Sequence, residues 1–240
     1  MKAQERHHLK ENEFATTAAR VAEQVSLNRS SILMVAGAAV VVAAIVGGYF
    51  YMQSRTYDQA SALLGAGLVI EQATIAPAPT LPGAKQPAGT YPTEAARGEA
   101  AIAAFQKTID AYPTHEVGTA ARYHLGTTLL SLGRGADAER AFAEATATGG
   151  SSLYAEMARL GHAQALGAQK KYDEAIKALT DLSGQRDGRL PLDGVLMELA
   201  RVCRQAGKTQ EARAAFKRVV DEFSDSGYVT EARQQLATMG

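Results

Sequence analysis

The feature that most constrains this chain is a pattern of apolar residues that repeats every 37 residues through its C-terminal part. In every copy, an alanine is followed four positions later by a large apolar residue. The alanines are Ala101, Ala138, Ala175 and Ala212, and the large residues are Phe105, Phe142, Leu179 and Phe216. Upstream, the pairs Leu125-Gly126, His162-Ala163 and Leu199-Ala200 keep the same period. A spacing of four places side chains one turn apart on one helix face, so the pattern predicts helices.

The two sets of columns indicate two antiparallel helices in each unit. A small residue is needed where two helices cross closely, and a large one fills the space a turn later. Neither helix can bury its apolar stripe alone, so neighbouring units must stack. We therefore expect an all-α solenoid of about four helix pairs. Residues 228–239 carry Val229, Ala232 and Leu236 on one stripe, which predicts a C-terminal capping helix.

The A-x3-F pattern in one helix and the L-[GA] pair in the other resemble the tetratricopeptide repeat (TPR) over residues 93–240. The family unit is about 34 residues, and the three extra residues here would lengthen the turn between units. Gly133, Gly135 and Gly207 fall where the resemblance places the turn inside each unit.

The first unit is irregular. Its second helix is expected over residues 93–111 and its first over 57–73, with Leu64-Gly65 aligned to Leu125-Gly126. Between them lies a loop, residues 76–92, that holds Pro77, Pro79, Pro82, Pro87 and Pro92. Proline removes backbone donors and fixes φ, so this segment should be extended and exposed. It is either a partner-binding loop or a tolerated insertion.

A membrane span precedes the repeats. No charged residue occurs over residues 30–54, and the 21 residues from Ile32 to Met52 are almost wholly apolar. As a helix they would be roughly 31 Å long, the thickness of the hydrocarbon layer. A cleaved signal peptide is the competing interpretation, but the run is long and lies behind 29 residues. We expect an uncleaved signal-anchor whose helix continues past Arg55 with little break.

Basic residues set the expected orientation. Five precede the span, and only Arg55 lies within 20 residues after it; the five are Lys2, Arg6, Lys10, Arg20 and Arg29. This bias keeps the N-terminus in the cytoplasm. In a bacterium, residues 1–29 would be cytoplasmic, 30–54 would cross the inner membrane, and 55–240 would form a periplasmic TPR-like domain.

Two weaker features could serve membrane partners. Ala39, Ala43 and Gly47 lie on one face of the span, a small-residue spacing that allows close packing of a second transmembrane helix. Residues 9–27 show helical apolar spacing and predict a short amphipathic helix on the bilayer or on a partner.

Catalytic or metal-binding chemistry has no support in the pattern. The net charge is zero, which disfavours a nucleic-acid footprint. Five histidines and one cysteine lack metal-ligand spacing, and no phosphate loop occurs. Cys203 and His162 align with leucine columns, so we expect both in the core. We expect neither enzyme activity nor a cofactor.

The TPR resemblance implies that the first helix of each unit lines a concave, partner-binding groove. Carried over by register, the groove residues are Tyr123, Thr127, Leu130, Met157, Leu160, Gln164, Met197, Arg201 and Arg204. The groove would be apolar with a basic end, and Arg201 would be free to meet a partner, so that its removal leaves stability nearly unchanged. Protein segments are the implied ligands, and nucleic acid is not.

The layout of a short N-terminus, one membrane helix and a small TPR array resembles the ancillary subunit of the bacterial Sec translocon. The resemblance implies association with the translocon and with periplasmic chaperones that receive emerging, unfolded segments. The alternative is a structural scaffold for another envelope complex, in cell division, outer-membrane assembly or bioenergetics.

Overall fold

A computed structural model describes residue 16 and residues 29–80, 85–185 and 188–239. The amphipathic helix expected over residues 9–27 therefore lies outside the described residues. The chain divides into two compact units, Met1–Thr56 and Tyr57–Gly240.

The expected long apolar helix is α2, Arg29–Glu71, which continues past Arg55 as predicted. Within the described residues, it is the one helix long and apolar enough to cross a membrane. The small residues Ala39, Ala43 and Gly47 are all exposed on it.

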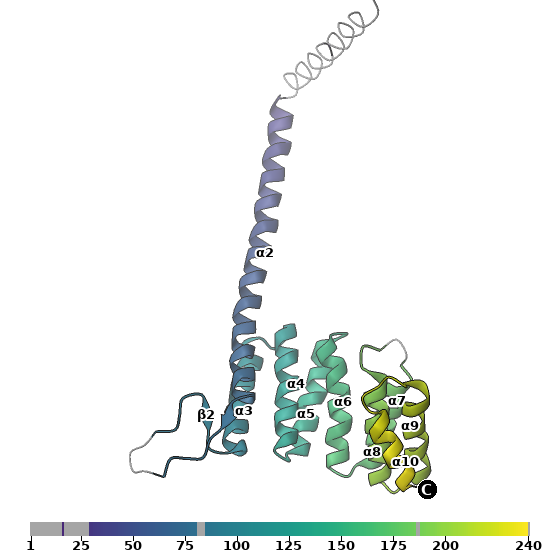
Figure 1. The fold of residues 1–240 in the computed structure, drawn as a ribbon. Coiled ribbons are helices and arrows are strands. Elements are labelled where there is room, and N and C mark those ends of the chain that lie inside the picture. The colour runs from purple at the N-terminus through teal and green to yellow at the C-terminus, as the bar shows by residue number, and fades with distance from the viewer. Residues whose placement is uncertain (1–15, 17–28, 81–84, 186–187, 240) are drawn as a thin grey trace, which may run out of the picture. The chain divides into compact units, whose positions relative to one another are not determined.

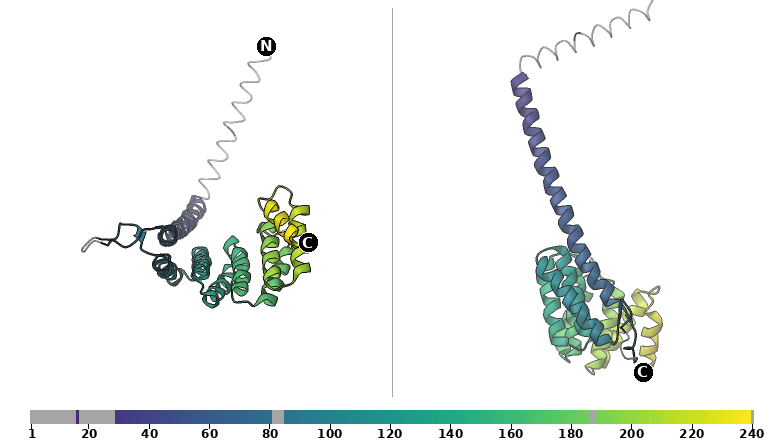
Figure 2. Two further views of the ribbon diagram at one scale, coloured as in Figure 1. Left: turned by 60° about the horizontal axis from the view of Figure 1, so that its bottom comes forward. Right: turned by 90° about the vertical axis from the view of Figure 1, so that its left-hand side faces the viewer.

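The second unit, Tyr57–Gly240, is a stack of helix pairs (Figure 1). We call the first helix of each pair an A helix: the end of α2 from Tyr57, α4 (Glu116–Ser131), α6 (Leu153–Ala168) and α8 (Leu192–Gln205). The B helices are α3 (Glu94–Ala111), α5 (Gly135–Gly149), α7 (Tyr172–Ser183) and α9 (Thr209–Glu222), and α10 (Val229–Thr238) follows. Figure 2 shows these helices following one another along an arc. The predicted all-α solenoid of four pairs with a capping helix is confirmed.

The repeating columns form the core. All four alanines and all four large residues of the B helices have no exposed surface. Phe142 shows why small residues must face it: a Cβ on Gly126 of α4 would lie 2.7 Å from its ring, and one on Gly161 of α6 would lie 2.5 Å away. One aromatic ring therefore fills a notch between two successive A helices, and burying it contributes about 1.5–3 kcal/mol.

The first helix pair, the end of α2 with α3, uses the same notch, but its register differs from the predicted one. A Cβ on Gly67 would lie 2.6 Å from the ring of Phe105, whereas Gly65 has no neighbour within 4 Å of that position. The alignment of Leu64-Gly65 with Leu125-Gly126 is therefore wrong by two residues. Either glycine fits a short sequence motif, but only Gly67 faces α3.

The turn inside each unit has one geometry, repeated three times. Arg134, Lys171 and Lys208 each donate a backbone N–H to the carbonyl five residues earlier, at 2.9 Å. This Schellman-type closure requires a left-handed residue just before the donor. Gly133 and Gly207 supply it as predicted, with φ of 73° and 75°, and Lys170 supplies it with φ of 63°. Gly135, predicted in the turn, instead begins α5.

The side chains of the same three turn residues reach the preceding B helix. Arg134 lies 3.3 Å from Glu99, Lys171 lies 2.9 Å from Glu139, and Lys208 lies 2.6 Å from Asp173. The Lys171 ammonium and the Gln169 amide lower the pKa of Glu139 below its ordinary value. Such exposed ion pairs each contribute about 0–1 kcal/mol, so they orient the units more than they stabilise them.

The proline-rich loop is tied at its base. Two short parallel strands, β1 (Thr74–Ile75) and β2 (Thr90–Tyr91), close it. Gln86 Nε2 donates to the Ala76 carbonyl at 2.9 Å and lies 2.8 Å from Thr90 Oγ1. The sequence predicted an extended segment but not this ladder, because two residues on each side are too few to form a strand pattern.

Replacing Ala138 by leucine should destabilise the array by about 1–3 kcal/mol or unfold it, because a filled crossing cannot accept three more carbon atoms. Urea unfolding followed by circular dichroism measures the loss. Ala136→Leu, at an exposed position of the same helix, should change stability little. Equal effects of the two changes would contradict the crossing.

Lys170→Gly should raise the free energy of unfolding by up to about 1 kcal/mol, because a left-handed conformation strains a residue with a Cβ. Thermal unfolding monitors the gain. The control, Lys177→Gly, removes an exposed lysine within α7 and should lower stability by about 1 kcal/mol.

Candidate functional site

Side chains of neighbouring helices meet in two clusters. We call the first the aromatic cluster: Glu71 of α2, Phe105 of α3, Tyr123 and His124 of α4, Phe142 of α5 and Tyr154 of α6. We call the second the arginine cluster: Glu198, Arg201 and Arg204 of α8, with Glu231 and Gln235 of α10.

Ring contacts build the aromatic cluster. The ring of Tyr123 lies 5.2 Å from that of His124, 5.9 Å from that of Tyr154 and 6.0 Å from that of Phe142. His124 in turn stacks on Phe105 at 5.5 Å. Phe105 and Phe142 are fully buried, while the other three rings are partly exposed. The core aromatics thus support a layer of partly exposed rings on α4 and α6.

A carboxylate borders this layer. Glu71 Oε2 lies 3.1 Å from His124 Nδ1, and Oε1 lies 3.4 Å from the hydroxyls of Thr127 and Thr128. Both threonine hydroxyls also donate to the His124 carbonyl at shorter distances, 2.9 and 2.8 Å. Burial raises the pKa of Tyr123, and the negative charge of Glu71 and the neighbouring Tyr154 add to the shift. The electrostatic field at the Tyr123 hydroxyl therefore disfavours an anion.

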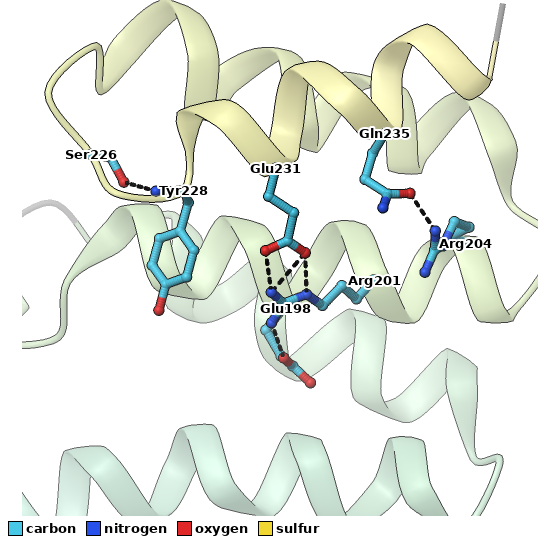
Figure 3. Close-up of polar contacts among 7 residues, drawn as sticks. All are labelled: Glu198, Arg201, Arg204, Ser226, Tyr228, Glu231 and Gln235. Atoms are coloured by element: carbon cyan, nitrogen blue, oxygen red, sulfur yellow. Dashed lines mark hydrogen bonds and ion pairs between the residues drawn. The ribbon is translucent and has the colours of Figure 1, made fainter.

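The arginine cluster is already paired, as Figure 3 shows. Arg201 Nη2 donates to both carboxylate oxygens of Glu231 at 2.8 Å, and Arg201 also lies 3.8 Å from Glu198. These bonds with Glu231 raise the pKa of Arg201 above its ordinary value. Arg204 Nη1 donates to the side-chain oxygen of Gln235. The capping helix α10 therefore occupies the place of a next A helix beside α8.

The predicted groove residues fall into two groups: those on α4 and α6 are partly exposed, and those on α8 are buried or paired. Tyr123, Thr127, Leu130, Met157, Leu160 and Gln164 are all partly exposed on α4 and α6. Met197 is fully buried, so the prediction that it lines a groove is wrong. The prediction of a free Arg201 is also wrong, because Glu231 holds its guanidinium. The alignment placed α8 correctly but took no account of what α10 would cover.

Sequence reasoning missed Glu71, His124 and Tyr154 as neighbours of Tyr123. A signal existed for Tyr154, since successive A helices meet at residues about 31 apart, as in Tyr123–Tyr154 and Arg204–Gln235. For Glu71 no such stride holds, because the proline-rich loop lengthens the first unit.

An open, largely apolar depression of about 530 Å³ lies elsewhere, between α5, α6 and α7. Its lining includes Ala143, Ala147, Arg159, His162 and Asp181, and none of the predicted groove residues. His162 is partly exposed there, so its predicted place in the core is wrong. Cys203 is buried as expected, and burial raises the pKa of its thiol. Within the described residues, no group of three metal-ligating side chains converges.

Arg201→Ala should lower the free energy of unfolding by about 1 kcal/mol, the upper end for exposed pairs, because Glu231 would lose a two-pronged, charge-assisted partner. Thermal unfolding should also show earlier exposure of α10, which hydrogen exchange can follow. Arg140→Ala, which removes a more exposed pair on α5, serves as the control and should have little effect. An unchanged melting temperature for Arg201→Ala would contradict the capping contact.

Comparisons with known proteins agree with this architecture. A family model described as Tetratricopeptide repeat matches residues 94–152 and 160–227, more than half of the chain. The chain is similar in structure to the nearly identical TPR-like repeats of a Podosopora anserina kinesin light chain, with a TM-score of 0.52 and 16% sequence identity. The similarity covers 60% of this chain and 77% of that chain. A single-substitution variant of those repeats gives the same values. No curated protein matches the chain. The two matched segments contain α3–α5, the second half of α6 and α7–α9. On this ground the chain belongs to the tetratricopeptide repeat family, whose repeats act as scaffolds for protein–protein interaction.

Proposed function

We propose that the chain is a membrane-tethered periplasmic scaffold, and that it acts as an ancillary subunit of the translocon. In this role it links secreted proteins that emerge from the channel to periplasmic chaperones. The observation that carries the proposal is the single helix α2, in which an apolar stretch continues into the first A helix. A partner-binding array whose first helix is also its anchor is suited to work at a membrane surface.

Residues flanking the apolar stretch support the orientation. The excess of Lys and Arg before it favours a cytoplasmic N-terminus and places the repeats on the opposite side. Ala39, Ala43 and Gly47 would give a translocon helix a close approach within the bilayer. Their exposure in the described structure is compatible with such a contact.

The partner would lie against the A helices α4 and α6. There Tyr123, Thr127, Leu130, Met157 and Gln164 offer partly exposed apolar and polar groups. Thioether and aromatic side chains adapt to loosely specified apolar segments, which suits a scaffold that meets many unfolded chains. The buried Met197 and the paired Arg201 do not belong to this proposed surface.

A photo-crosslinking amino acid at Tyr123 in living cells should capture translocon subunits, periplasmic chaperones or secreted chains, identified by mass spectrometry. The same group at Lys177, exposed on B helix α7, is the control and should capture far less. Capture of a cell-division, outer-membrane or bioenergetic complex instead would favour the alternative scaffold. Purification in mild detergent with neither translocon nor chaperones would remove the proposal.

Deletion of residues 1–29 separates the two roles further. A translocon subunit should lose or exchange partners when its cytoplasmic segment is removed. A scaffold that works through its repeats alone should keep the same partners.

A further inference from the structure

We propose that Glu71, Tyr123 and Tyr154 form a recognition site for one basic side chain, preferentially arginine, in the partner segment. This inference rests on the proposed function, because it assumes that a partner segment lies on α4 and α6. In this proposal the partner segment carries a positive charge and places it at Glu71, neither of which follows from the resemblance to the TPR family.

The carboxylate of Glu71 has an acceptor to spare. Each threonine hydroxyl carries one hydrogen, and those of Thr127 and Thr128 are directed to the His124 carbonyl at 2.9 and 2.8 Å. Their 3.4 Å contacts with Glu71 Oε1 are therefore poor hydrogen bonds. His124 Nδ1 serves only the other oxygen, Oε2. Since the Glu71 side chain keeps 27% of its surface exposed, a donor from outside can reach it.

The tyrosines supply the second half of the site. The rings of Tyr123 and Tyr154 lie 5.9 Å apart and are inclined by 50°. Both rings border the ring of His124, at 5.2 and 6.0 Å, and His124 Nδ1 lies 3.1 Å from the carboxylate of Glu71. A guanidinium within about 6 Å of a tyrosine ring is attracted by its quadrupole. Arginine suits the site better than lysine because its planar group stacks on a ring and also donates two parallel bonds to a carboxylate.

The charges along the A helices favour a basic ligand over an acidic one. Within the described residues, the ion-pair partner of Glu71 is His124 rather than a lysine or arginine. The negative charge of Glu71 also raises the pKa of Tyr123, so the site favours positive charge. At the other end, Arg201 is already held by Glu231 and Glu198, which leaves little attraction for a carboxylate.

The test uses the full chain in detergent micelles and a fluorescent leucine–alanine heptapeptide with one central arginine. A second peptide carries citrulline, which keeps the shape of arginine but has no charge. Fluorescence anisotropy should show that the arginine peptide binds about fivefold more tightly, and that Glu71→Gln removes this preference while the citrulline peptide is unaffected. Tyr154→Leu should weaken the arginine peptide by a few-fold.

Asp221→Asn is the matched control, because it removes one negative charge from an exposed position of α9. It should leave both affinities unchanged, and circular dichroism should show that Glu71→Gln is folded. Equal binding of the two peptides, no binding of the arginine peptide, or an equal effect of Asp221→Asn would overturn the basic site. Crosslinking from Met157, which is partly exposed on α6 and outside the basic site, tests the scaffold function separately, because it captures a partner segment of any charge.

Discussion

The structure depends on one repeated contact, in which a large apolar side chain of a B helix fills a notch made by two successive A helices. Phe142 lies against Gly126 of its own pair and Gly161 of the next. The same ring therefore closes one hairpin and joins it to its neighbour. Because the contact is shared, a single pair cannot bury its apolar surface alone, and the array is stable only as a stack.

The sequence predicted the parts of the fold that this contact governs. Columns of alanine and phenylalanine 37 residues apart must point to the same place in every pair, whatever happens at the helix ends. The ends themselves were less predictable. The connection 184–191 is longer than 150–152, while α7 and α8 are shorter than α5 and α6. The longer connection offsets the shorter helices, so the repeat period is unchanged and does not reveal these differences. Lys170 also takes a glycine's conformation, which its residue type does not indicate.

The candidate site was predicted only in part, for a physical reason. The repeat register predicts where a residue lies on its helix, but it does not predict which residues the next helix covers. Tyr123 and Thr127 are partly exposed, whereas α10 supplies Glu231 to Arg201, 30 residues away in sequence. Glu71 and His124 are 53 residues apart, because Glu71 belongs to the irregular first helix pair and His124 to the second. Gly67 against Phe105 and the stacking of Phe105 on His124 show the register that brings them together.

Because the base of the proline-rich loop is paired, a change in the loop need not alter the packing of the helix pair that it interrupts. Thr74–Ile75 and Thr90–Tyr91 are paired, and Arg97 of α3 donates to the Ala73 carbonyl, so the ends of the loop stay together. Lengthening an exposed loop between fixed ends costs little entropy. Affinity tags or a reporter domain inserted after Thr80 would therefore leave both termini and the α4–α6 surface untouched, and would provide a handle for isolating intact assemblies.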